Sequence, residues 1–93
     1  MKTKFLVIIE KGENNFSAYS PDVSGCAATG KSVEETLENM RVALEFHIEG
    51  MLENGEKFPA PRSLNYYLAE TDEISSEDII AHVSVETPEP AFA

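Results

Sequence analysis

The segment from Val33 to Asn54 restricts the possible folds more than any other part of the chain. Its apolar side chains recur at the spacing of an amphipathic helix and form one stripe about 100° wide. Ser32 is the expected N-cap, and Glu35 three residues later completes a capping box. Gly55 predicts the end of the helix. The stripe consists of Val33, Leu37, Met40, Leu44, His47, Ile48 and Met51.

Four shorter segments predict a sheet for this helix to cover. Residues 3–10 form a nearly continuous apolar run, typical of a strand at the centre of a sheet. Residues 16–20 follow a turn rich in Gly and Asn and are expected to form a hairpin with the first strand. Residues 25–30 are small and apolar and predict a third strand. Residues 79–85 alternate in polarity, as in a last strand with one buried face.

The order of these segments predicts an α+β fold of the type β-β-β-α-β, an antiparallel sheet covered by one long helix. A chain of 93 residues has room for one small domain, which we place at residues 1–86. Residues 87–93 are interpreted as an acidic, proline-containing tail. Residues 64–69 are expected to add a short helical turn packed by Leu64, Tyr67 and Leu68.

The charge of the chain narrows the possible partners. The formal net charge is −10, and residues 63–93 hold seven of the 17 acidic residues but none of the seven Lys and Arg residues. Nucleic-acid affinity comes mainly from Lys and Arg, so direct DNA binding is not expected. An acidic surface favours basic partners or simply solubility. No apolar run reaches the roughly 20 residues of a membrane helix, which predicts a cytoplasmic protein without membrane contact.

The side chains that could carry chemistry are scattered. Cys26, His47 and His82 have no metal-ligand spacing, and no glycine-rich phosphate loop occurs. The single cysteine excludes an internal disulfide. Two-metal nuclease chemistry would need carboxylates converging from strand and helix, whereas the helix carboxylates line its solvent side. The sequence therefore predicts no cofactor, no metal and no enzymatic activity.

Val42 and Phe46 do not belong to the core stripe. They lie one helical turn apart on the opposite side of the helix and form one apolar patch. They are either scattered surface residues or a contact face for another chain or for the C-terminal segment. We interpret them as an oligomer interface, because a thin core in so short a chain favours association. The expected assembly is a homodimer or a larger even-numbered oligomer.

Residues 19–44, YSPDVSGCAATGKSVEETLENMRVAL, carry an ordered set of short motifs. A strand ends in Pro-Asp, a short Gly-Cys strand follows, and a glycine turn leads into a helix that opens with Ser-x-Glu-Glu. Asp22 is expected to hydrogen-bond the turn backbone, and Gly30 to permit a tight start of the helix. The motif residues are Pro21, Asp22, Gly25, Cys26, Gly30, Ser32, Glu35 and Asn39.

This ordered set resembles the HicB-like antitoxin family. The resemblance covers residues 3–86 and implies a fold like a truncated ribonuclease H core without its nuclease residues. It also implies a function, namely binding and neutralising a small basic HicA-type toxin that cleaves mRNA. Many family members carry a C-terminal DNA-binding domain, and here only a short acidic stretch follows the last strand. An orphan binding or scaffold domain with another partner, or a degenerate nuclease, are the alternatives.

An acidic segment after the long helix is the expected contact with such a toxin. It contains no cation of its own and would occupy the place of RNA phosphates on the basic surface of the toxin. The alternative is that the segment is only a solvated loop. Its acidic residues are Glu70, Asp72, Glu73, Glu77 and Asp78.

Overall fold

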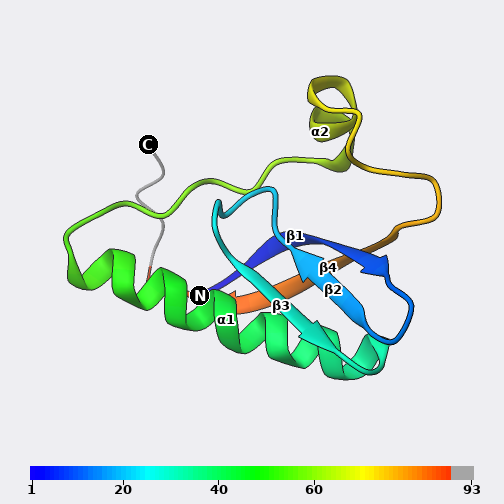
Figure 1. The fold of residues 1–93 in the computed structure, drawn as a ribbon. Helices are drawn as coiled ribbons and strands as arrows, with labels where there is room; N and C mark the ends of the chain where they lie inside the picture. Colours follow the sequence, from blue (N-terminus) through cyan, green and yellow to red (C-terminus); the bar gives the residue numbers. More distant parts are fainter. Residues whose placement is uncertain (89–93) are drawn as a thin grey trace.

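The computed structural model of the chain describes residues 1–88. Four strands and two helices follow one another as β-β-β-α-α-β, with the long helix α1 lying across the sheet (Figure 1). The expected α+β fold is confirmed, and the helical turn expected at residues 64–69 is present as α2. The elements are β1 (Lys2–Lys11), β2 (Phe16–Tyr19), β3 (Ala27–Gly30), α1 (Val33–Glu53), α2 (Leu64–Glu70) and β4 (Ile79–Glu86).

The sheet has the order β3-β2-β1-β4, and every neighbouring pair is antiparallel. The predicted hairpin of β1 and β2 is confirmed, and β1 lies inside the sheet with β4 on its other side. Ile8 pairs with Tyr19 on β2 and with Ile80 on β4. These three side chains therefore form a row across one face of the sheet.

The two faces of β1 are both buried, which explains its nearly continuous apolar sequence. Phe5, Val7 and Ile9 belong to the core that packs against α1. Leu6 and Ile8 alternate with them, point to the other face and are also fully buried. The sheet therefore needs cover on both sides, and α1 supplies only one.

Helix α1 begins and ends as its sequence predicts. The Glu35 N–H donates to Ser32 Oγ at 3.0 Å, while the Glu35 carboxylate accepts from the N–H of Lys31 rather than from that of Ser32. Gly55 has a φ of +74°, which glycine adopts at low cost after a helix C-cap. The apolar stripe faces the core, and Thr36, which is not part of it, is also fully buried.

The connector after α1 and the short helix α2 lie on the side of the sheet away from α1 (Figure 1). The N-cap of α2 is Ser63, whose hydroxyl accepts from the N–H of Tyr66. The predicted packing of α2 is only partly confirmed, because Leu68 remains 49% exposed. Neither helix within residues 1–88 is long and apolar enough to cross a membrane.

The two ends of the described chain meet beside β1 and β4. Thr87 is buried, its N–H donates to the Met1 carbonyl at 2.8 Å, and its hydroxyl lies 2.7 Å from that of Thr3. Ordered contacts thus reach one residue past the predicted domain end at residue 86. Most of the predicted tail, residues 89–93, lies outside the described residues.

Candidate functional site

The carboxylate of Asp22 joins three separate parts of the fold. Asp22 is only 6% exposed, and its Oδ2 accepts the N–H of Leu6 at 2.8 Å. Leu6 lies past the last residue of β1 that pairs with β2, so Asp22 replaces the missing strand partner. Its Oδ1 accepts the N–H of Arg62 at 2.9 Å and the hydroxyl of Tyr67. The expectation that Asp22 bonds its own turn is wrong, because strand, connector and α2 provide its partners instead.

No side chain of α2 is fully buried, so packing alone does not fix this helix. The hydrogen bonds from Arg62 and Tyr67 to Asp22 hold it in place. Burial, together with the hydrogen bond to Asp22, raises the pKa of the Tyr67 hydroxyl above its usual value. The proton therefore stays on Tyr67 and continues to bridge to the carboxylate. The neighbouring Tyr66 packs its ring against Tyr67 edge-on, with 5.1 Å between centroids, and under the guanidinium of Arg62.

The rest of the predicted motif forms the turns on either side of β3. Gly25 has a φ of +83°, a conformation that favours glycine. Gly30 lies against the first turn of α1, where a Cβ atom would approach the Thr36 backbone nitrogen to 2.7 Å. Pro21 is half-buried after β2. Position 30, before the helix, thus requires glycine because α1 packs closely against it, and not because its φ is positive.

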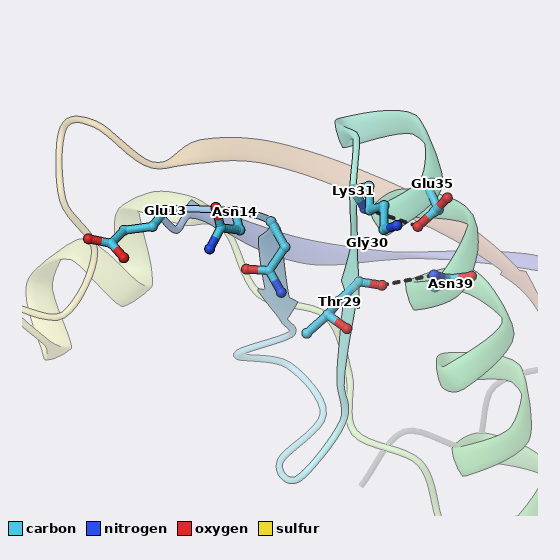
Figure 2. Close-up of a pocket in the computed structure, with 8 residues that line it drawn as sticks. Glu13, Asn14, Thr29, Gly30, Lys31, Glu35 and Asn39 are labelled. Atoms are coloured by element: carbon cyan, nitrogen blue, oxygen red, sulfur yellow. Dashed lines mark hydrogen bonds between the residues drawn. The ribbon is translucent and has the colours of Figure 1, made fainter.

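A polar hollow of about 760 Å³ lies between the β1–β2 turn, the end of β3 and the start of α1 (Figure 2). Three motif residues line it, Gly30, Glu35 and Asn39, and the polar side chains of Glu35 and Asn39 are hydrogen-bonded within the fold. The Asn39 side chain donates to the Thr29 carbonyl at 2.8 Å, and Glu35 accepts from the Lys31 backbone. The Asn39 bond joins α1 to β3, and the Glu35 bond joins α1 to Lys31, the residue that follows β3.

The possible catalytic and metal-binding side chains are not brought together. Cys26 is buried after the turn before β3, and burial raises the pKa of its thiol, which disfavours the reactive thiolate. His47 is partly buried on α1, and His82 is exposed on β4. Within residues 1–88, no group of three or more His, Cys, Asp or Glu side chains is placed to hold a metal ion.

The outer face of α1 carries the apolar patch that the sequence indicates. Phe46 is 79% exposed and Val42 is 52% exposed. Arg41, on the same helix, forms ion pairs with Glu38 and Glu45, one turn before and one turn after it. The exposure of the two apolar side chains is confirmed, and their role as an oligomer interface stays a prediction.

The acidic segment runs from the end of α2 to the start of β4. Glu70, Asp72, Glu73 and Glu77 are exposed, whereas Asp78 is half-buried and its carboxylate accepts the Ser75 N–H at 2.9 Å. Asp78 therefore shapes the turn before β4. Burial of Tyr19 and the neighbouring carboxylates of Glu10, Glu73 and Asp78 together raise the pKa of the Tyr19 phenol. Glu73 and Asp78 of the acidic segment thus lie near Tyr19, whose side chain is on the sheet face opposite α1.

The structure is a small α+β domain in which one helix covers an antiparallel sheet. The motif residues between Pro21 and Asn39 lie in the turns around β3 and in the first turns of α1. The family model for the HicB-like antitoxin of bacterial toxin-antitoxin systems matches residues 5–89. The chain therefore belongs to the HicB-like antitoxin family.

The chain is also similar to individual proteins of known sequence or structure. An uncharacterised 14.9 kDa protein of Haemophilus phage HP1 is 37% identical over 62 residues, which are 67% of this chain. The match spans about half, 47%, of the length of that phage protein. The crystal structure of the N-terminal domain of the Burkholderia pseudomallei antitoxin HicB superposes with a TM-score of 0.75 at 25% identity. That match covers 91% of this chain and 100% of the other.

A HicA3 and HicB3 toxin-antitoxin complex contains a chain of the same fold. It matches with a TM-score of 0.69 at 24% identity and covers 91% of this chain and 100% of that chain. At this identity the match supports the fold alone.

Proposed function

We propose that this protein is an antitoxin that binds and neutralises a small basic HicA-type toxin, acting by binding and not by catalysis. Membership in the HicB-like antitoxin family supports this role. A related fold occurs in a toxin-antitoxin complex of HicA3 and HicB3. A toxin that cleaves mRNA acts in the cytoplasm, and we place its antitoxin there as part of the same proposal.

The observation that carries the proposal is the separation of charge along the chain. Residues 63–93 contain seven acidic residues and no Lys or Arg, so their carboxylates have no cation of their own segment nearby. Four of them, Glu70, Asp72, Glu73 and Glu77, are exposed to a partner. An RNA-binding surface presents the opposite potential, which speeds encounter and disfavours wrong partners.

The test uses a purified small basic toxin of the HicA type, sought first in the reading frames next to the gene of this protein. An equimolar amount of this protein should stop RNA cleavage by the toxin. The association rate should fall as salt rises toward 0.5 M, because the Debye length then shrinks to about 4 Å. Replacing Glu70, Asp72 and Glu73 by Gln, Asn and Gln should slow association about tenfold at low salt, with little change in thermal stability.

The matched control replaces three acidic residues of α1 that lie on the other side of the sheet. Glu34, Glu49 and Glu53 changed to Gln remove the same net charge, yet they should change the association rate far less. Equal slowing by both triple variants would mean that total charge, and not the acidic segment, directs the encounter. Undiminished RNA cleavage would reject the antitoxin role for this toxin and favour a binding domain with another partner.

We also propose that the outer face of α1 joins two copies of the chain through Phe46 and Val42. Replacing Phe46 by Glu should convert a dimer into a monomer, because it places a charge in the centre of the apolar contact. Light scattering at micromolar concentration measures the mass. Changing the exposed Leu52 to Glu adds the same charge to α1 outside the patch and serves as control. A monomeric parent protein, or an unchanged mass in the Phe46 variant, contradicts this interface.

A further inference from the structure

A second apolar surface lies on the sheet face opposite α1, between α2 and the first residues of β4. It is a groove of about 350 Å³, at the small end of the roughly 300–1,000 Å³ of ligand pockets. Leu68 on its wall is 49% exposed, and Ile80 is 36% exposed. Its apolar lining consists of Leu64, Leu68, Ile74 and Ile80.

The groove is built on the folded sheet and is therefore preformed. Ile80 pairs with Ile8, which is fully buried, so the base of the groove continues the row across the sheet. Its opposite wall is α2, which the Tyr67 hydroxyl fastens to Asp22. A preformed groove costs little conformational entropy when a partner docks.

The charges around the groove select its occupant. Asp78 lines it directly, and the acidic segment contributes four further carboxylates, one at the end of α2 and three between α2 and β4. A second copy of this chain would bring carboxylates against carboxylates, and nucleic acid would be repelled in the same way. A basic protein surface instead meets the opposite charge.

We propose that the groove receives an apolar side chain from a basic protein surface, while the carboxylates around it contact the Lys and Arg residues beside that side chain. This inference rests on the proposed antitoxin function. It places the groove at the desolvated centre of the contact with the toxin and the acidic segment at the rim of that contact. Binding energy concentrates in such central, desolvated anchors, whereas the charged rim mainly affects the association rate.

The experiment compares two serine variants of α2, one at a residue that lines the groove and one at a residue that does not. Leu68→Ser removes an apolar wall, whereas Tyr66→Ser removes a side chain of similar exposure, 41%, that does not line the groove. Affinity for the purified basic toxin should fall at least tenfold for Leu68→Ser, mainly through faster dissociation. It should stay within about twofold for Tyr66→Ser. Thermal unfolding verifies that both variants fold.

A second variant, Ile80→Thr, tests the base of the groove and keeps a β-branched side chain suited to a strand. It should also accelerate dissociation. If the parent protein neutralises the toxin but both groove variants bind as the parent does, the groove is rejected and the antitoxin role stands. If the parent does not bind the toxin at all, both proposals fall. A loss of self-association in Leu68→Ser would show that a second copy occupies the groove and would also reject this inference.

Discussion

Replacing Asp22 with Ala is expected to lower the free energy of unfolding by about 3 kcal/mol, because it leaves buried donors without an acceptor. The N–H of Leu6 is buried and has no strand partner at this position, and the N–H of Arg62 and the hydroxyl of Tyr67 lose their acceptor as well. Small domains are stable by only about 5–15 kcal/mol, so this single change removes a large fraction. Urea unfolding followed by circular dichroism measures the effect.

Two further variants separate the contributions within this cluster. Tyr67→Phe removes one hydrogen bond but leaves the carboxylate and both backbone donors, so it should cost about 1 kcal/mol. Asp72→Ala removes an exposed carboxylate of the acidic segment and should change stability by less than about 0.5 kcal/mol. A loss for Asp22→Ala as small as that for Asp72→Ala would contradict the role of Asp22 as the link between β1, the connector and α2.

Replacing Gly30 with Ala is expected to destabilise the protein by about 1–3 kcal/mol. The added Cβ would lie 2.6 Å from Thr36 Oγ1, 2.7 Å from its backbone nitrogen and 3.0 Å from its Cα. Two of these three atoms belong to the backbone of α1, so a side-chain rotation cannot relieve the clash. Helix and strand must move apart, which also strains the Asn39 bond to Thr29.

The same substitution at Gly50 is the control, and its effect has the opposite sign. Gly50 lies within α1, and a Cβ there would meet nothing within 4 Å. Gly50→Ala should therefore stabilise the protein by about 0.5–1 kcal/mol through higher helix propensity. Thermal or urea unfolding of the two variants side by side gives the comparison. Equal effects at the two positions would show that the contact between Gly30 and Thr36 is not tight.

The sequence by itself determined the elements whose signals are local. Helix α1 follows from its periodicity, the Ser32 cap and Gly55, all of which act within a few residues of one another. The strands follow from alternation or from a continuous apolar run, and the exposure of Phe46 follows from its place outside the stripe. The apolar pattern does not include Thr36, because its hydroxyl is polar; the side chain is nevertheless buried, since this hydroxyl donates to the Ser32 carbonyl one turn back.

Only the tertiary structure decided what Asp22 bonds and where the groove lies. The partners of Asp22 are 16, 40 and 45 residues away in the sequence. The backbone N–H groups of its own turn are equally good donors for a carboxylate, so the sequence does not distinguish the two arrangements. The groove likewise joins α2, the acidic segment and β4, none of which forms an apolar surface alone. Such contacts depend on how the chain closes over the second face of the sheet, and no pattern of neighbouring residues encodes that closure.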